Sequence, residues 1–320
     1  MKICILGNVE SSWQKTYSWF CKTLWQGCLL NGHQVIPVKY KQSFDDIKNI
    51  ILDDPPDVIF THTVDHGVHD IRMVLSFFEH LRSYYGVKIV HTLHDARHEP
   101  RYSGNLSYAY DLALLGQTHN LKKFQTMWKV PVYFWPYPCL YQEKIADPRP
   151  DLAFSEAVFT GSPNTHGDRA QFIANLRRYT PLKIFITKST EDKKELTAEL
   201  ATSAYCILAL CTGYDIKHYT DCRFWQYGGA GAFIIGRKFN SMDELIPDSL
   251  YLPFDSYAHP DQVGNLINIY KNKKTETAQM RINMFNFMQR YHNAKIRVKY
   301  TIDIIEGKTD TVKAFISEQR

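Results

Sequence analysis

The residues best suited to chemistry surround one arginine, Arg223. A short run of helical character starts near it, is broken by Gly228, Gly229 and Gly231, and gives way to an apolar run over residues 232–235. Glycines at such a junction let another group approach the backbone closely. An arginine beside a helix N-terminus offers a phosphate a forked cation and free backbone N–H groups. The spacing fits a phosphate site and a helix packed tightly on a sheet equally well.

The same stretch resembles the donor signature of group 1 glycosyltransferases, Arg-x-x-Glu-x-x-x-x-Gly-x-Phe. It corresponds here to Arg223, Gln226, Gly231 and Phe233. The branch named after a spore-maturation protein is the most similar, because residues 242–246 and 251–255 also have counterparts in it. In this family the arginine faces the diphosphate of a nucleotide sugar and the glutamate holds the ribose hydroxyls. The resemblance implies the GT-B fold, a nucleotide-sugar co-substrate and no catalytic metal, and we expect a UDP-sugar.

Two positions depart from the family pattern. Gln226 replaces the ribose-binding glutamate, and His218 occupies the place where related families have a second glutamate. The glutamine carbonyl can still accept one ribose hydrogen bond, but it has no charge. Because both acidic residues are missing, a second hypothesis stays open: the chain could be a GT-B binding or scaffold protein without catalytic activity. The retained Arg223 favours an enzyme.

Further polar residues follow the predicted strands at their carboxyl ends, where open parallel sheets bind ligands. In the second half they are glycines, hydroxyls and cations, which suit a phosphate. We expect the nucleotide-sugar site to include Arg223 and Gln226 together with Gly7, Asn8, Gly161, Ser162, Thr187, Lys188, Thr212 and Gly213.

The strand ends of the first half are richer in histidine and aspartate. His94 and Asp95 close a strongly apolar strand, and either could take the proton of an acceptor hydroxyl if the reaction inverts the anomeric centre. Arg223 would stabilise the charge that builds on the leaving phosphate. The expected catalytic set is therefore His94, Asp95 and Arg223. The two histidine clusters, over residues 62–70 and 91–99, match no known metal-ligand spacing, and no metal is expected there.

The acceptor is left open between a small molecule, a cell-surface glycan precursor and DNA. Basic residues interleaved with aromatic ones suit a nucleic acid, such as a duplex with hydroxymethylated bases. An ordinary solvated lysine face explains part of the same pattern. The expected acceptor-binding residues are His62, Asp65, Arg97, Arg101, Tyr102, Trp135 and Tyr137.

Length and composition limit the class of protein. The 320 residues, 44% hydrophobic and 22% charged, suit two globular domains. The net charge of +5 fits anionic substrates without demonstrating nucleic-acid binding. Seven cysteines without a C-x-x-C pair favour a reducing compartment. With no signal peptide and no apolar run of membrane-spanning length, we expect a cytoplasmic protein.

Apolar strands alternate with helical patterns along the chain, which predicts mostly parallel sheets with right-handed crossovers. The polar, proline-rich stretch 145–151 is the best linker. We expect an α/β protein of two Rossmann-like, doubly wound domains facing a cleft. Residues 1–148 would form the acceptor domain and residues 149–320 the donor domain. The resemblance also implies a C-terminal helix that crosses back to the first domain.

Overall fold

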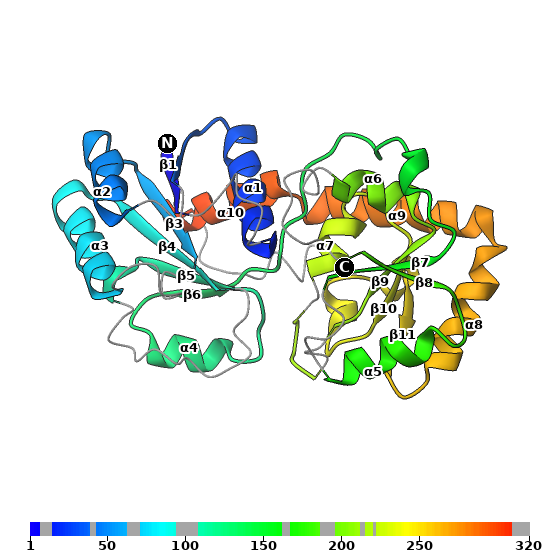
Figure 1. Ribbon diagram of the computed structural model, residues 1–320. Coiled ribbons are helices and arrows are strands. Elements are labelled where there is room, and N and C mark those ends of the chain that lie inside the picture. The colour runs from blue at the N-terminus through cyan, green and yellow to red at the C-terminus, as the bar shows by residue number, and fades with distance from the viewer. Residues whose placement is uncertain are drawn as a thin grey trace. The chain divides into compact units, whose positions relative to one another are not determined.

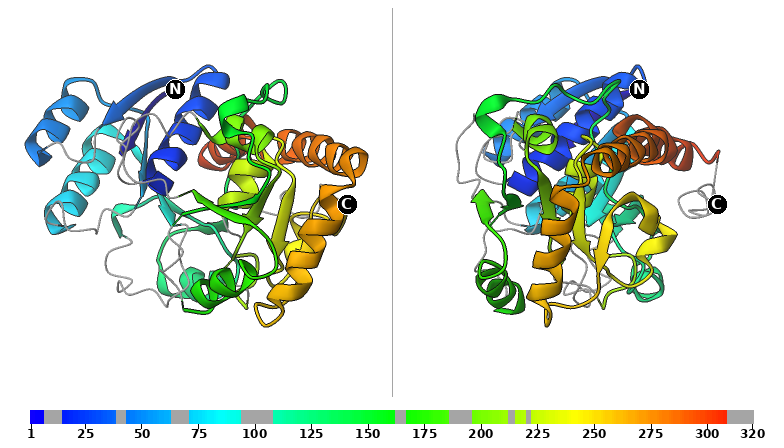
Figure 2. Two further views of the ribbon diagram at one scale, coloured as in Figure 1. Left: turned by 45° about the vertical axis from the view of Figure 1, so that its right-hand side comes forward. Right: turned by 90° about the vertical axis from the view of Figure 1, so that its right-hand side faces the viewer.

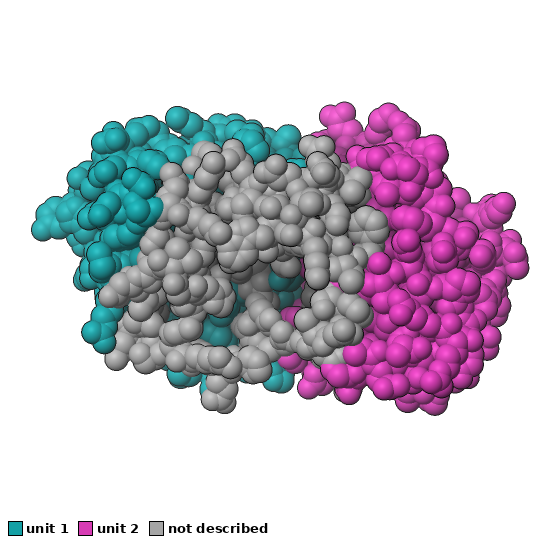
Figure 3. Space-filling model, viewed as in Figure 1, with its two compact units in different colours: residues 1–137, 294–320 teal, residues 138–293 magenta. Residues whose placement is uncertain are grey.

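The chain folds into two compact units, each built on a parallel sheet (Figure 1). The computed structural model describes residues 1–6, 15–38, 43–62, 71–93, 108–161, 167–185, 196–211, 215–219 and 222–308. The first unit comprises Met1–Tyr137 and Ala294–Arg320, and the second comprises Pro138–Asn293 (Figure 3).

The first unit contains a six-stranded parallel sheet of order β2-β1-β3-β4-β5-β6. Its strands are mostly short apolar runs, as expected where helices cover both faces. They are β1 (Lys2–Leu6), β2 (Gln34–Val38), β3 (Val58–His62), β4 (Lys88–Leu93), β5 (Leu112–Leu115) and β6 (Val132–Phe134). Its helices are α1 (Lys15–Leu30), α2 (Phe44–Asp53), α3 (Ile71–Tyr85), α4 (Leu121–Met127) and α10 (Ala294–Ile305).

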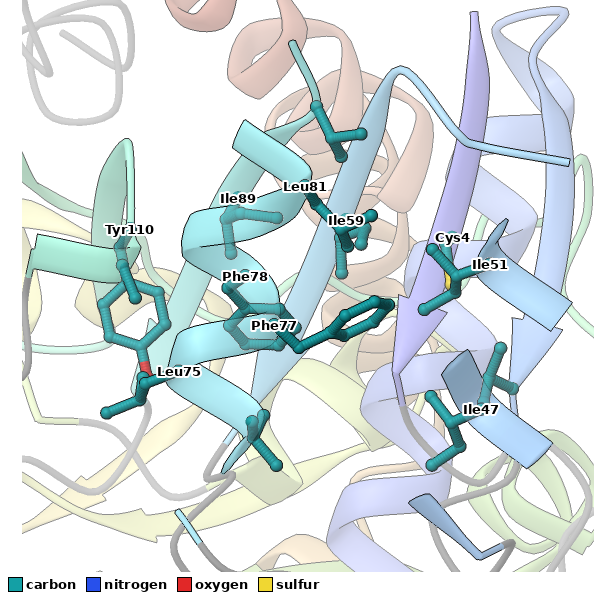
Figure 4. Packing of buried hydrophobic residues seen from close by; sticks show 14 residues of the cluster. Cys4, Ile47, Ile51, Ile59, Leu75, Phe77, Phe78, Leu81, Ile89 and Tyr110 are labelled. Carbon is teal, nitrogen blue, oxygen red and sulfur yellow. The ribbon is translucent and has the colours of Figure 1, made fainter. Parts of the chain in front are cut away.

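A hydrophobic core joins this sheet to α2 and α3 (Figure 4). Cys4, Ile59 and Ile89 come from neighbouring strands, and Phe78 and Leu81 reach them from α3. All five are fully or almost fully buried, which stabilises the unit by roughly 1.5–3 kcal/mol for each large side chain.

The C-terminal helix α10 belongs to the first unit, where it packs on α1. Gly27 of α1 makes this contact possible, because a Cβ there would overlap the carbonyl of Ala294. Asn31 fixes the end of α1 through hydrogen bonds from its amide to the carbonyls of Gly27 (2.7 Å) and Lys295 (2.8 Å). The predicted return of the last helix to the first domain is confirmed.

The second unit contains a five-stranded parallel sheet of order β11-β10-β9-β7-β8. The strands are β7 (Ala157–Thr160), β8 (Leu182–Phe185), β9 (Cys206–Ala209), β10 (Ile234–Arg237) and β11 (Leu252–Phe254). The helices are α5 (Gly167–Leu176), α6 (Leu196–Ser203), α7 (Cys222–Gly228), α8 (Pro260–Lys271) and α9 (Lys274–Tyr291). Single-turn 3-10 helices cover Pro150–Leu152, Met242–Glu244 and Asp248–Leu250.

Helices cover both faces of this second sheet (Figure 2). Phe172 of α5 and Ile267 of α8 share a core with Phe159 and Leu208 of the strands. On the other face, Gly236 of β10 lies against the ring of Phe224 from α7, with no room for a Cβ. The predicted pair of doubly wound α/β domains is confirmed.

The units divide after Tyr137, earlier than the boundary between residues 148 and 149 that composition suggested. The segment after Tyr137 is bound to the end of α9. Cys139 donates from its backbone N–H to the carbonyl of His292 (2.9 Å) and forms a parallel bridge with Asn293. A polar, proline-rich composition marks the later stretch, but the hydrogen bonds of Cys139 and Gln142 attach the segment that follows Tyr137 to the second unit.

In the part of the chain that the structure describes, no helix combines the length and apolar character needed to span a membrane.

Candidate functional site

The carboxyl end of β7 holds the guanidinium group of Arg223. From the start of α7, Arg223 donates from Nε to the carbonyl oxygen of Thr160 (2.7 Å) and to its hydroxyl (3.3 Å). Nη2 donates to the same carbonyl. The guanidinium carbon also lies 4.7 Å from the centre of the Phe159 ring. These contacts fix a forked cation at the edge of a parallel sheet where ligands bind.

Gly161 makes room for this arginine. It follows β7 with φ at +113°, a conformation that favours glycine, and a Cβ at this position would overlap Nη2 of Arg223. The structure thus brings together two residues that the sequence singled out separately. Their contact depends on the absence of a side chain at residue 161.

Arg223 and Gln226 lie on the same side of helix α7. They are three residues apart and therefore lie one above the other, while Phe224, Trp225 and Tyr227 are buried. Gln226 is half-buried, and its amide makes no hydrogen bond within the described part of the chain. A half-buried amide beside Arg223 suits a polar ligand.

The glycines after α7 serve packing. A Cβ at Gly229 would overlap the side chain of Cys139, and Gly231, at φ +86°, faces Ile145. These glycines let α7 end tightly against the segment that enters the second unit. The glycines therefore fit the interpretation of the motif as a packing contact, and a phosphate site at Arg223 stays a prediction.

Two more arginines lie at this edge. Arg169, in the first turn of α5, is 6% exposed and its guanidinium carbon lies 5.4 Å from the centre of the Phe159 ring that Arg223 also faces. Arg237, at the end of β10, lies 3.9 Å from the ring centre of Tyr257. Sequence reasoning missed Arg169; its signal is an arginine in the first turn of the helix that follows the β7 loop. Three guanidinium groups make this edge suited to an anion.

His218 is buried and contacts a carboxylate, which indicates a structural role. It is 2% exposed, adopts a left-handed backbone conformation (φ +59°), and its Nε2 lies 3.0 Å from a carboxylate oxygen of Glu244. Burial lowers the pKa of His218, although Glu244 acts in the opposite direction. The neutral imidazole then donates to Glu244 and anchors the loop that precedes α7.

The carboxyl edge of the first sheet also gathers buried polar groups. Thr61, the last residue but one of β3, lies opposite His91 of β4, and Gln117 follows β5. His91 stacks on Tyr110 with ring centres 4.6 Å apart. The hydroxyl of Thr61 and both amide atoms of Gln117 are buried and have no hydrogen-bond partner in the described part of the chain. Such groups are costly to leave unpaired, so this edge suits a ligand with hydroxyl or amide groups.

Many of the predicted site residues lie outside the described residues. They are Gly7, Asn8, Asp65, His94, Asp95, Arg97, Arg101, Tyr102, Ser162, Thr187, Lys188, Thr212 and Gly213. His62 ends β3, with only its backbone described. Trp135 and Tyr137 are buried, at 0% and 8% exposure. Their role as a stacking platform for an acceptor stays a prediction. No three histidine, cysteine or acidic residues among those described could together hold a metal ion; most of the two histidine clusters lies outside that part.

The two units define the class of the fold: it is GT-B, two Rossmann-like α/β domains with a last helix that returns to the first. No family model and no curated protein matches the sequence. Solved structures do match. An alpha-glucosyltransferase bound to UDP and a 13-mer DNA containing an HMU base is 12% identical, with a TM-score of 0.64 over 96% of this chain and 99% of that one.

Two further structures extend the likeness. An alpha-glucosyltransferase with UDP-glucose and DNA containing an abasic site gives a TM-score of 0.68 at 11% identity, over 95% of this chain and 99% of the other. HepE of Anabaena, bound to UDP and glucose, gives 0.61 at 10% identity, over 96% and 100%. These structural neighbours are glycosyltransferases of the GT-B type, and identities this low establish the shared fold.

Proposed function

We propose that the protein is a glycosyltransferase that moves a sugar from a nucleoside-diphosphate sugar to a hydroxyl acceptor. The observation that carries the proposal is Arg223, fixed at the carboxyl end of β7 by Thr160 and given room by Gly161. A forked cation at this position can bind a diphosphate and stabilise the charge that grows on it as the sugar leaves. UDP is the expected nucleotide, because the neighbours were solved with UDP or UDP-glucose.

The polar residues at the two sheet edges favour donor binding by the second unit and acceptor binding by the first. Arg169, Arg223 and Arg237 suit the donor phosphates, with Gln226 toward the ribose. Thr61 and Gln117 suit an acceptor with hydroxyl groups. His94 or Asp95 as base, and the spore-maturation branch as the particular subfamily, belong to this proposal on sequence grounds alone. A cytoplasmic location likewise stays a prediction.

A transfer assay tests this function. The protein is incubated with UDP-glucose and separate acceptors, and released UDP and the acceptor mass are measured. We expect UDP release and an acceptor heavier by one hexose, both abolished in Arg223→Ala. A scaffold protein would release no UDP, and no nucleotide sugar would raise its melting temperature.

DNA with hydroxymethylated bases is the acceptor that a specific observation favours. The neighbours solved with DNA reach TM-scores of 0.64–0.68, against 0.57–0.61 for HepE. The protein should then add hexose to a hydroxymethylated duplex, and its affinity for DNA should fall steeply with salt, with a slope set by the number of phosphate contacts. A duplex that neither binds at low salt nor gains hexose would leave a small molecule or glycan as acceptor.

A further inference from the structure

A pocket opens at the edge of the second sheet opposite to the one that holds Arg223. Its volume is about 370 Å³, within the range of small-molecule sites. Its walls include the residues that lead into β7 and β9, among them Phe154 and Tyr205, and one side of α9. Arg223 and Gly161 lie beyond the far end of β7, a strand of four residues that spans roughly 13 Å. The pocket is therefore separate from the donor edge.

Arg281 of α9 forms the inner wall of this pocket. Its Nη1 donates to the carbonyl of Thr202 (2.7 Å), and its Nη2 donates to those of Ala204 (2.5 Å) and Tyr205 (2.9 Å). All three acceptors are neutral backbone groups at and just after the end of α6. Arginine stays protonated when buried. In the described part of the chain no carboxylate pairs with Arg281, so the wall carries a positive charge balanced only by peptide dipoles.

Lys274 gives the pocket a second cation. It is the exposed first residue of α9 and lines the pocket about two turns before Arg281 on the same helix. The described residues that line the pocket include no aspartate or glutamate. Two positive charges without an acid in the wall create a local potential that attracts anions.

An aromatic residue, Phe154, completes the wall. Phe154 is half-buried, and the Nζ of Lys183 lies 5.3 Å from its ring centre. The ring of Tyr205 packs in the core, and its hydroxyl donates to the carbonyl of Ile267 (3.0 Å). A ring beside cations suits a compound that has both a flat ring system and a phosphate. We propose that this pocket binds a small phosphomonoester, with its phosphate between Lys274 and Arg281 and its ring against Phe154. A nucleoside monophosphate has this chemistry.

Calorimetric titration with AMP, adenosine and inorganic phosphate tests the proposal. Saturating UDP is present throughout, so that any nucleotide site at the donor edge is occupied. AMP should bind, and Lys274→Glu should weaken it on the order of tenfold or more, the effect of replacing a charge-assisted contact by repulsion. A glutamate in the first turn of α9 interacts favourably with the helix dipole, so a loss of binding would not reflect a weakened helix.

Lys122→Glu is the matched control, because it makes the same charge change at an exposed position in the first turn of α4 in the first unit. It should leave AMP binding unchanged, as should Arg223→Ala. Phosphate binding as tightly as AMP would mean that the site recognises the phosphate alone and would remove the role of the Phe154 ring. Equal binding of adenosine and AMP, an unaffected Lys274→Glu variant, or binding of single-stranded DNA but not AMP would each overturn the proposal.

Discussion

At the scale of single residues, the arrangement that matters most is the fit between Arg223 and Gly161. They are far apart in the sequence, and each has an ordinary explanation by itself. Only the register of the second sheet, which brings the end of β7 to the start of α7, makes them partners. Sequence reasoning could find both positions but could not predict their contact. Sequence reasoning did not identify Arg169 as a site residue, because an arginine within a helical pattern is usually solvated.

Replacing Gly161 by alanine should move Arg223. The new Cβ would overlap Nη2, and the left-handed backbone would be strained. We expect affinity for UDP to fall about tenfold or more, the loss of a charge-assisted contact. Gly86→Ala is the control, since Gly86 has φ +68° with open space around it. It should cost about 1 kcal/mol of stability and leave UDP affinity unchanged. Equal UDP affinity in Gly161→Ala and the wild type would contradict this account of the site.

Gln226→Glu tests the ribose contact. If Gln226 faces the ribose, a carboxylate there should bind the two hydroxyls more strongly than the amide does. We expect tighter binding of UDP, by up to about tenfold, and no gain for 2'-deoxyuridine diphosphate, which lacks one hydroxyl. An equal change for both nucleotides, or none, would show by calorimetry that Gln226 does not contact the ribose.

His218 should make stability depend on pH. Its pKa in the folded protein lies below the unfolded value of about 6.5, because burial disfavours the imidazolium. The stabilisation is complete above that value and decreases as the pH falls below it, since the unfolded chain then takes up a proton that the folded chain does not. The loss is at most about 1.4 kcal/mol per pH unit for one group.

Urea unfolding from about pH 7.5 to about pH 5.5 measures this effect. His218→Gln can still donate to Glu244 but cannot titrate, so its stability should fall less with decreasing pH than that of the wild type. Parallel curves for the two proteins would mean that His218 titrates alike in the folded and unfolded chains.

At the scale of elements, hydrophobic pattern predicted the alternation of strands and helices because buried parallel strands are short apolar runs. Lys2–Leu6 forms β1 as expected. The strand expected over 232–235 begins later, at Ile234, because Gly231 and Ala232 still hydrogen-bond to α7 through the carbonyls of Gly228 and Tyr227. The ends of helices and strands depend on such local hydrogen bonds, which cannot be predicted from hydrophobic periodicity.

Gln289 of α9 joins three segments of the second unit. Its amide donates to the carbonyls of Leu140 and Gly229 (2.8 Å each), and its carbonyl oxygen accepts from the backbone N–H of Gln142 (3.1 Å). Gln289→Met keeps the size of the side chain and removes these bonds. We expect unfolding free energy to fall by about 1–3 kcal/mol. Gln279→Met, which removes an exposed bond to Asn283 on the same helix, should change it by less than about 0.5 kcal/mol in chemical denaturation. Similar values for both variants would mean that Gln289 does not hold these segments together.

At the scale of the whole molecule, the fold was the part most accessible from the sequence. Two doubly wound units follow from the order of elements and from the short right-handed crossovers of parallel sheets, whereas the returning helix was implied by the resemblance to GT-B glycosyltransferases. The domain boundary did not follow from composition, because hydrogen bonds from Cys139 and Gln142 attach residues before 148 to the second unit. The acceptor also could not be derived, because basic residues interleaved with aromatic ones fit both a nucleic acid and an ordinary solvated face.

The central claim is that Arg223 binds the diphosphate of a nucleotide sugar, and calorimetric titration of UDP into the wild type and Arg223→Ala tests it most directly. Arg178→Ala serves as control, because Arg178 is an exposed arginine of the same unit. Circular dichroism should show that all three proteins are folded. UDP should bind the wild type and Arg178→Ala alike and Arg223→Ala on the order of tenfold or more weakly. Equal affinity of Arg223→Ala and the wild type, or no binding of UDP or another nucleoside diphosphate to the wild type, would contradict the claim.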